Sequence, residues 1–314
     1  MKTIKVILVG LVLLSSGLSI AQQDVQFTQY NDNMLHYNPA YAGNRDVLTV
    51  TALHRQQWVG MKGAPMSTTL ALHTPLKYEA IGVGVSLLND RVGPLTQSWI
   101  AGDISYTLRF GSTSNSRRSA DDPRLSFGVK GVMNMLNADL DRLQTTDQND
   151  VDLQNYNNKM GANVGAGVYF RSKHLFAGVS VPRILEPNKT SLTTASQTRQ
   201  RHYYATLGGI IEVNRQLKLR PTTMVKITEN APLAIDGSLA FIFYDKLWLA
   251  GNYRLLESAG VYVQYQISPQ FKIGYGFDIS TNSLVRFNAG THEILLSYDL
   301  RRMTKGAIVS PRFF

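Results

Sequence analysis

Short runs that alternate apolar with small or polar residues fill most of the chain from about residue 47 onward. In AGVYVQYQI (259–267), every second residue from Val261 to Ile267 is apolar, whereas the residues between them are Tyr or Gln. The run AIGVGVSLL (80–88) alternates in the same way between aliphatic residues and Gly or Ser. A period of two places successive side chains on opposite faces of a β-strand. Each run therefore predicts a strand with one apolar face and one polar or glycine-rich face.

About fourteen such runs follow one another along the chain and predict an all-β fold. They lie near residues 47–55, 66–73, 79–88, 97–110, 124–135, 160–171, 174–181, 201–213, 216–228, 233–244, 246–255, 258–267, 270–279 and 290–301. Alternation alone also suits a soluble β-sandwich. Three further features favour a transmembrane antiparallel outer-membrane β-barrel.

The first feature is the composition of the polar face. It carries many glycines and scattered charges such as Lys130, Asp236 and Asp278. The dry interior of a sandwich would leave such charges without water, whereas the water-facing or plugged interior of a membrane barrel tolerates them.

The second feature is the length of the connections. Those after even-numbered runs are mostly tight, whereas several after odd-numbered runs are long, which is typical of outer-membrane barrels. The tight turns lie at 171–173, 214–215, 245 and 268–269, and the long connections at 136–159, 182–200 and 280–289. Two connections depart from this rule, because 111–123 is long where a turn is expected and 256–257 is short where a loop is expected.

The third feature is the aromatic residues at the ends of the runs. Outer-membrane barrels place aromatic girdles at both lipid–water interfaces. The candidate girdle residues are Tyr106 and Phe110, Tyr169 and Phe170, Tyr203 and Tyr204, and Phe243 and Tyr244. An even number of strands returns both termini to the periplasm.

Residues 1–21 are interpreted as a secretory signal peptide. Lys2 and Lys5 supply the positive charge, residues 6–14 are apolar, and Ser19–Ala21 fits a cleavage site. The apolar stretch is much shorter than the roughly 20 residues that span a bilayer as a helix. We therefore expect an exported protein.

The rest of the chain divides into three parts. We expect residues 22–46 to form an N-terminal plug or periplasmic segment, 47–301 the barrel, and 302–314 a C-terminal tail. The tail ends in Phe313 and Phe314, which resemble the aromatic end that outer-membrane proteins use for assembly.

Composition narrows the classes of function. The chain has no cysteine, which excludes both a disulfide framework and a lipid-anchored cysteine. Its net charge is +10, and removing Lys2 and Lys5 leaves 30 basic against 22 acidic residues, or +8. Outside the cytoplasm this charge favours phosphorylated lipid headgroups and polyanionic surface polymers as partners. No basic stripe with interleaved aromatic residues is present in the sequence, so nucleic acid is not expected as a partner.

The stretch QFTQYNDNMLHYNPAYAG (26–43) fits neither a strand nor a long helix, because it alternates poorly and is rich in Asn and Pro. Its aromatic residues make too much apolar surface for a solvated tail, although a flexible periplasmic tail is the alternative. A barrel of about fourteen strands has room inside for more than its own side chains. We therefore expect Tyr30, Asn38, Pro39 and Tyr41 to contact the barrel interior as parts of a plug.

Two further pairs of residues are candidate contacts. Arg55 and Trp58 fall at the mouth of the first predicted hairpin. One interpretation is a girdle Trp beside an Arg that binds lipid phosphate. The other is a gate or a partner contact on the extracellular rim. Arg117 and Arg118 lie in the long 111–123 connection on the periplasmic side. We expect that connection to be a docking site for a periplasmic partner.

No metal or cofactor site is predicted. The six histidines include no pair at metal-ligand spacing, and His292-Glu293 begins an H-E-x-x-H pattern in which Leu296 replaces the second histidine. The acid-rich stretch 139–155 lacks the glycine turn of a calcium loop, so a solvated loop is favoured over weak cation binding.

Nucleophilic catalysis also finds little support. The chain has no G-x-S-x-G elbow. His54, His73 and His174 lie near predicted strand ends, which leaves a hydrolase at the barrel rim as the enzymatic alternative. Single histidines more often satisfy a local hydrogen bond, so we expect a protein that is not an enzyme and has no cofactor.

Several short motifs resemble those of a known family. QFTQY (26–30) followed by NPAYAG (38–43) resembles the N-terminal signature of the PorP/SprF family of type IX secretion and gliding-motility outer-membrane proteins. Later pieces agree, and the ordered set is more specific than any single piece. They are RQQWVG (55–60) with GAP (63–65), LND (88–90) with Gly93, RHYY (201–204), HEI (292–294) and PRFF (311–314).

The resemblance implies a non-enzymatic outer-membrane component of the type IX protein secretion and gliding machinery. Members of the family look like barrels that link the outer membrane to the motor ring, whereas other members support export of a particular cargo. The implied partners are periplasmic ring or motor lipoproteins, a peptidoglycan-binding protein, outer-membrane lipid and secreted cargo proteins. A plugged diffusion channel, or a transporter of hydrophobic substrates, is the alternative function.

Overall fold

The computed structural model describes residues 24–76, 80–110, 122–139, 156–185, 201–228 and 231–300, with the backbone alone at 156–158. The predicted signal peptide (1–21), the tail (302–314), Arg117, Arg118 and most of the acid-rich stretch lie outside these residues. Those assignments stay predictions. Within the described ranges, no helix is both long and apolar enough to cross a membrane.

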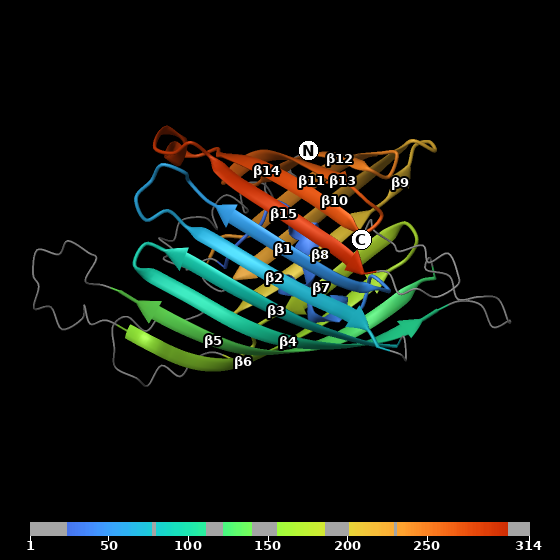
Figure 1. Cartoon of the computed structure of the whole chain (residues 1–314), viewed down its shortest axis with the longest axis horizontal. Coiled ribbons are helices and arrows are strands. Elements are labelled where there is room, and N and C mark those ends of the chain that lie inside the picture. The colour runs from blue at the N-terminus through green and yellow to red at the C-terminus, as the bar shows by residue number, and fades with distance from the viewer. Residues whose placement is uncertain are drawn as a thin grey trace, which may run out of the picture.

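The described strands form one antiparallel sheet that closes on itself as a barrel (Figure 1). Strand β1 pairs with β15 and β10 pairs with β11, so the sheet closes around the full ring of described strands. Strands β8 and β9 are two pieces of one strand, because both pair with β10 in the same register: Gly208 lies opposite Thr222, and Ile211 lies opposite Leu219. The barrel therefore has 14 strands, as the alternating runs predict.

Each predicted run overlaps one strand, except that 201–213 covers both β8 and β9, because alternation with period two is a local property of the sequence. The strands are β1 (Leu48–Gln56), β2 (Met66–Pro75), β3 (Ile81–Val92), β4 (Leu95–Arg109), β5 (Arg124–Ala138), β6 (Tyr156–Arg171), β7 (Leu175–Val181), β8 (His202–Gly209), β9 (Ile211–Glu212), β10 (Leu217–Thr228), β11 (Ala234–Phe243), β12 (Leu247–Arg254), β13 (Ser258–Gln266), β14 (Phe271–Ser280) and β15 (Thr291–Leu300). Strands β4, β5 and β6 are the longest of them, at 15 to 16 residues.

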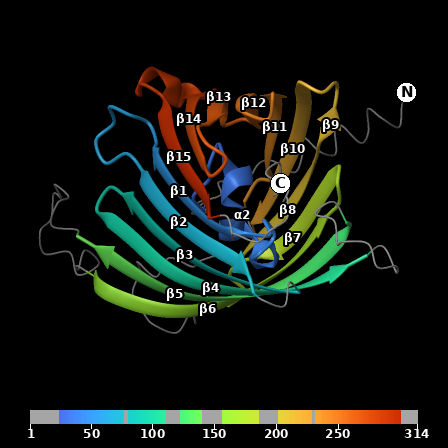
Figure 2. The ribbon, with the colours of Figure 1, turned by 45° about the vertical axis from the view of Figure 1, so that its right-hand side comes forward.

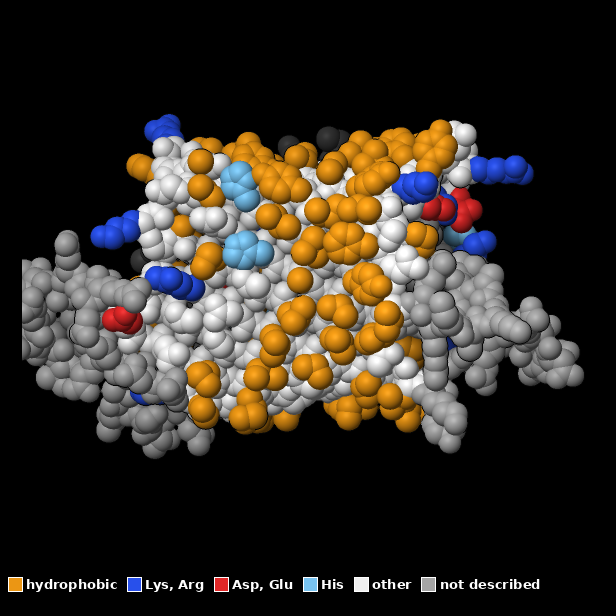
Figure 3. All heavy atoms as spheres, in the orientation of Figure 1, with side chains coloured by type: hydrophobic (Ala, Val, Ile, Leu, Met, Phe, Trp, Pro, Cys, Tyr) orange, Lys and Arg blue, Asp and Glu red, His pale blue; other side chains and the backbone are white. Residues whose placement is uncertain are grey.

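The two faces of the wall differ as the alternation predicts. In β13, Val261 is 61% exposed on the outer face, whereas Gln264 is 0% exposed on the inner face. On the side shown in Figure 3, apolar side chains spread over the middle of the outer face, and charged side chains lie at its two ends. Lys130, Asp236 and Asp278 are all buried in the interior. The barrel thus presents apolar groups outward and polar groups inward, as a membrane barrel does.

The connections define two ends of the barrel. We call the end where β1 finishes the loop end, because it carries the long connections 57–65, 139–155, 182–201 and 281–290. The opposite end is the turn end, with short connections such as 172–174 and 244–246. Both exceptions expected from the sequence are present, since 110–123 is long at the turn end and 255–257 is short at the loop end. In outer-membrane barrels the end with long loops faces the exterior.

The prediction of aromatic girdles is wrong for two residues. Tyr203 is 43% exposed on the outer face, but Tyr204 is 3% exposed and faces the interior. Tyr169 is likewise 1% exposed and points inward. Neighbouring residues of a strand point to opposite faces, so two adjacent tyrosines in one strand cannot both reach the lipid.

Candidate functional site: the N-terminal segment inside the barrel

Residues 24–47, which we call the N-terminal segment, lie inside the barrel before the chain enters β1. Figure 2 shows this segment, with the short helix α2, enclosed by the strands. It contains η1 (Tyr30–Asn33), α2 (Met34–Tyr37) and η2 (Pro39–Tyr41). The Asn38 side chain caps η2 by accepting a hydrogen bond from the Ala40 N–H at 2.9 Å, and Pro39 starts that turn, which separates η2 from α2.

The segment crosses the interior from one end to the other. Its first described residue, Asp24, pairs with Arg183 just after β7 and lies 3.4 Å from His202 at the start of β8, both at the loop end. Asp46 instead pairs with Arg124 at 2.8 Å and lies 3.6 Å from Arg171, both at the turn end. The described segment therefore runs from the loop end to the turn end before it begins β1. The expectation that the chain starts at the periplasmic end does not hold for Asp24, because Arg183 and His202 bind it at the loop end.

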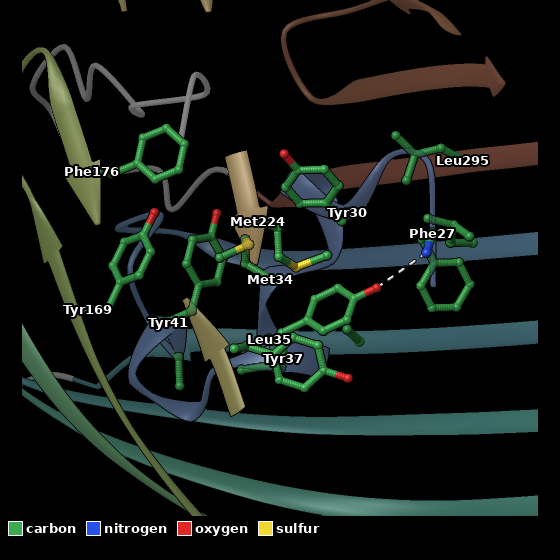
Figure 4. Packing of buried hydrophobic residues seen from close by; sticks show 14 of the residues in the cluster. Phe27, Tyr30, Met34, Leu35, Tyr37, Tyr41, Tyr169, Phe176, Met224 and Leu295 are labelled. Carbon is green, nitrogen blue, oxygen red and sulfur yellow. Dashed lines mark hydrogen bonds between the residues drawn. The ribbon is translucent and has the colours of Figure 1, made fainter. Parts of the chain in front are cut away.

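An apolar cluster forms the middle of the segment (Figure 4). Its members are Phe27, Tyr30, Met34, Leu35, Tyr37 and Tyr41, each at most 2% exposed. Tyr41 packs edge-on against Tyr169 of the wall at 5.3 Å between ring centroids, and Tyr37 packs against Tyr204 at 5.1 Å. The edge-to-face contact of Tyr41 adds to the free energy gained by burying the rings. The inward tyrosines of β6 and β8 therefore serve the segment and not the lipid.

A charged cluster near the loop end holds the start of the segment. Glu293 accepts hydrogen bonds from the backbone N–H groups of Thr28 at 2.9 Å and Gln29 at 2.8 Å. Arg55 lies beside it and donates to Glu293 at 3.1 Å, to Asp278 at 2.9 Å and to the Thr28 hydroxyl at 2.7 Å. The side chains of Arg55, Asp278 and Glu293 are almost fully buried. Their mutual contacts therefore replace the hydration that each charge lost on burial.

A second cluster surrounds Asp32 nearer the turn end. Lys272 donates to the Asp32 carboxylate, and Arg45 lies 3.3 Å from the same carboxylate and 3.5 Å from Asp299. Gln264 donates to the other oxygen of Asp32 at 2.7 Å. Burial alone would raise the pKa of Asp32, but Lys272, Arg220 and Arg45 hold it well below its usual range. Asp32 therefore stays ionised inside the barrel.

The first residue of the segment is held by a similar arrangement. Burial raises the pKa of Asp24, but Arg183 and His202 outweigh that effect and hold it below its usual range. The Tyr204 hydroxyl donates to Asp24 at 3.2 Å. Next to this group, His36 stacks on Trp99 at 4.9 Å, and its pKa falls to about 3 because burial disfavours the charged ring. His36 is therefore neutral at physiological pH.

The wall also binds backbone carbonyl groups of the segment, including those that its short helices leave unpaired. Lys130 donates to the Leu35 carbonyl at 2.9 Å, and Arg171 donates to the Asn44 carbonyl at 2.6 Å. Ser180 binds the Tyr37 carbonyl at 2.9 Å, and Ser105 binds the Ala42 carbonyl at 2.7 Å. The interior of the barrel thus supplies donors at the positions where the segment needs them.

Glycines on the inner face let the segment approach the wall closely. A Cβ atom added to Gly128 would lie 2.3 Å from the Ala40 nitrogen, and one added to Gly82 would lie 2.1 Å from the Ala42 oxygen. At Gly167 the added atom would lie 2.2 Å from the Asn38 side-chain oxygen. No real Cβ atom fits at these distances, so the glycines are needed for the contact.

The structure brings four of the eight candidate contact residues together. Tyr30 donates to Thr222 at 3.0 Å, Asn38 donates to the Val168 carbonyl at 3.0 Å, and Pro39 and Tyr41 are buried beside them. Arg55 faces the interior and is 2% exposed, so its assignment to lipid phosphate or to a partner on the rim is wrong. The reason is that its place in the alternation of β1 turns its side chain inward.

Trp58 lies apart from that group, in the connection after β1. The residue is half-buried, its φ of 48° is left-handed, and its backbone N–H donates to the Thr291 hydroxyl at 3.2 Å. Arg117 and Arg118 lie outside the described residues. The analysis of the sequence missed the wall residues that bind the segment, above all Glu293, Lys272 and Arg183. Glu293 and Lys272 appear in the sequence as charges on the polar face of a strand, whereas Arg183 follows a strand and has no such signal.

The histidines considered for hydrolysis do not converge. His54 faces outward and contacts Thr68 at 2.8 Å, whereas His73 is buried in the interior, where it accepts from the Gly43 N–H at 3.2 Å. His174 is exposed in the turn between β6 and β7. In the described part of the chain, no group of three or more His, Asp or Glu is placed to hold a metal ion. The arrangement binds a peptide segment and offers no assembled catalytic group among these residues.

The fold and the site define a class: a closed outer-membrane β-barrel whose interior binds part of its own chain. The family model described as type IX secretion system membrane protein PorP/SprF matches residues 19–298. The chain belongs to this family, and it is a membrane component of the type IX secretion system located in the outer membrane.

Comparison with solved structures gives remote similarities. The chain is similar to the outer membrane protein Omp33 of Acinetobacter baumannii, at 9% identity and a TM-score of 0.46 over 82% of this chain and 100% of that chain. It is similar to the CymD monoaromatic hydrocarbon channel at 9% identity and a TM-score of 0.47, over 87% and 94% of the two chains. A FadL homologue of Pseudomonas aeruginosa gives 11% identity and a TM-score of 0.43, over 84% and 93%. No curated protein matches the chain.

Proposed function

We propose that the protein serves the type IX secretion machinery as a closed barrel, in which the N-terminal segment is a plug and the turn end docks periplasmic partners. The observation that carries this proposal is that the segment crosses the whole interior and is ion-paired to the wall at both ends. A barrel closed in this way is suited to anchoring other proteins in the outer membrane, because it holds its shape without a bound solute.

The buried charges support a plug that stays in place. Withdrawal of the segment would leave Lys272 without Asp32, and Arg55 without Thr28. Separating a buried ion pair costs about 3–5 kcal/mol when one partner is left behind. Several such contacts break together if the segment leaves, so the plugged form is strongly favoured.

The turn end is the proposed docking surface. The described residues at this end expose Lys173, Arg215 and Lys246 alongside Glu212 and Asp245, a moderately basic mixture. The long 110–123 connection, with Arg117 and Arg118, belongs to the same end. A surface of this charge favours acidic partners, and the candidates are the ring or motor lipoproteins and a peptidoglycan-binding protein of the periplasm.

A deletion strain and a charge-reversal pair test the proposal. Deletion should abolish secretion of cargo proteins that carry the type IX C-terminal signal. Arg117→Glu with Arg118→Glu should lose the periplasmic partners in a pull-down. The matched control is Lys62→Glu with Arg91→Glu, which reverses two exposed basic residues of the loop end and should keep them. Normal secretion in the deletion strain would refute the role in secretion, and full partner recovery with the first pair would refute this docking surface.

A second candidate function is a channel whose plug moves. The observation that favours it is how the segment is attached. Within the described residues, the backbone–backbone hydrogen bonds of residues 29–46 join the segment to itself, and its contacts with the wall use side chains. Planar-bilayer recordings separate the two functions. The plugged-anchor proposal expects no conductance from the intact barrel and a clear conductance after deletion of residues 24–44, whereas spontaneous opening of the intact barrel would favour the channel.

A further inference from the structure

The outer face of the barrel carries an apolar groove of about 330 Å³ on strands β11 to β14. It crosses two neighbouring rows of outward side chains. Its lining includes Phe241, Leu249, Val261, Tyr275 and Phe277. The volume is at the lower end of the roughly 300–1,000 Å³ that small-molecule sites occupy.

The groove exists because Gly251 interrupts one of these rows. In that row Leu239 lies opposite Gly251, and Gly251 lies opposite Val261. A Cβ atom added at Gly251 would meet nothing within 4 Å, so the missing side chain leaves open space between its apolar neighbours. The next row, with Phe241, has no such gap, and the larger side chains around Gly251 form the sides of the groove.

A polar pair lies at the edge of this apolar surface. The Tyr275 hydroxyl lies 2.6 Å from His292 Nδ1, and the His292 ring lies 5.1 Å from the ring of Phe277. Both side chains of the pair are on the outer face, where the barrel meets hydrocarbon. Polar groups facing lipid are costly unless they find partners, so a pair beside an apolar groove is suited to a ligand with a polar linkage and a long apolar chain.

The groove extends across the middle of the barrel and reaches into its outer half. Gly251, Val261 and Phe277 lie in the halves of their strands nearer the loop end, which faces the exterior, whereas Phe241 and Leu249 lie nearer the turn end. The connection after β14 also presents Arg286, with Val285 and Phe287 exposed on either side of it. A cation flanked by exposed apolar side chains is typical of residues at the level of lipid headgroups.

We propose that this groove is a binding site for an acyl chain of lipid A, the phosphorylated glycolipid of the outer leaflet. The chain lies over Gly251 between the rows, and the ester or amide group at its head hydrogen-bonds to the Tyr275–His292 pair. Arg286 contributes positive charge toward the phosphate. The site is distinct from the plug and from the turn end, so it adds a lipid ligand to the proposed function.

Native mass spectrometry of the full-length barrel, with purified lipid A added in increasing ratio, tests the site. Gly251→Leu fills the groove and should weaken lipid A binding by about tenfold or more, which corresponds to roughly 1.4 kcal/mol. The matched control is Gly102→Leu, because Gly102 also faces outward with nothing within 4 Å of an added Cβ, but it lies in β4, away from the groove. This control should bind lipid A as the unmodified protein does.

A second variant tests the polar pair. His292→Phe keeps an aromatic ring but removes the hydrogen bond to Tyr275, and should weaken binding less than Gly251→Leu does. Phosphatidylethanolamine is the comparison lipid and should bind more weakly than lipid A. Equal binding by Gly251→Leu and Gly102→Leu would overturn the site, and equal binding of the two lipids would overturn the assignment to the outer leaflet. Neither result bears on secretion, so the docking proposal would stand separately.

Discussion

The inner and outer faces of the same strands follow different rules. In β5, Gly128 and Lys130 face inward and each contacts one particular group of the N-terminal segment, whereas Val129 and Gly131 between and beyond them face outward. The choice of residue at an inner position is limited by a particular group of the N-terminal segment at a fixed distance. Outer residues are defined only by being apolar, because lipid adapts to their shape. Specificity and much of the stability therefore reside on the inner face, and exchange of an inner residue should cost far more than exchange of its outer neighbour.

The largest expected difference is at Glu293 and its neighbour Ile294. Glu293→Ala removes the acceptor of two backbone N–H groups and leaves Arg55 with one carboxylate fewer. We expect a loss of about 3–5 kcal/mol in the free energy of unfolding. Ile294→Leu, on the outer face, keeps the apolar area that meets lipid and should change it by no more than about 0.5 kcal/mol. Urea titration in lipid bilayers measures both values, and similar losses would remove the distinction between the faces.

Two glycines of β5 give the next comparison. Gly128→Ala places a methyl group against the backbone of Ala40, and overpacking of this kind costs about 1–3 kcal/mol, so we expect a value at the top of that range. Gly131→Ala faces outward into open space and should be nearly neutral. The same unfolding measurement applies to both. If Gly131→Ala were the more damaging change, the close approach of the segment would not limit residue choice.

The pH dependence of stability tests the burial of His36. Its pKa is about 3 in the folded protein because of burial, with Lys130 and Arg183 acting in the same direction and Asp24 opposing them. The unfolded chain binds the proton first, near pH 6.5, so stability is complete above that pH and falls as the pH drops toward 3.

Between pH 7 and pH 5 we expect a loss of about 2 kcal/mol from this residue. His36→Phe keeps a ring against Trp99 but cannot titrate, so that variant should show a correspondingly smaller loss over the same interval. Equal pH dependence of the two proteins would show that His36 is not buried in its neutral form.

Single-cysteine variants should have the smallest effect on stability, and their labelling tests whether the N-terminal segment crosses the barrel from end to end. The chain has no cysteine, so single-cysteine variants give a clean signal. A cysteine inserted directly before Asp24 should react with a membrane-impermeant maleimide on intact cells, because Asp24 lies at the loop end. Arg215→Cys, in the turn after β9, should react only after the outer membrane is permeabilised. Labelling of both positions from the same side would contradict the crossing of the barrel.

The strands could be predicted from the sequence because alternation is local and survives without any knowledge of neighbours. The ion pairs inside the barrel could not, since Asp32 and Lys272 are 240 residues apart and meet only when the barrel closes. The inward orientation of Arg55 could not be predicted either, although it depends on a single strand. Its strand mixes Leu53 with polar residues on the inner face, so the alternation of β1 alone does not reveal which face is inward.

The aromatic residues teach a related lesson. Tyr203 and Tyr204 look equivalent in the sequence, yet one meets lipid and the other packs on Tyr37. The alternation was sufficient to separate them once both were placed in one strand. The sequence does not show that Tyr204 packs against the ring of Tyr37, because Tyr37 lies almost 170 residues earlier in the chain.

The position of the N-terminal segment has a consequence for biogenesis. The segment leads directly into β1, and β1 pairs with β15, the last strand in sequence, to complete the ring. A segment that extends from one end of the barrel to the other is most simply enclosed before the sheet has closed. Insertion into the membrane should therefore begin with a curved, open sheet that already binds residues 24–47. Pairing of the first strand with the last should then enclose these residues.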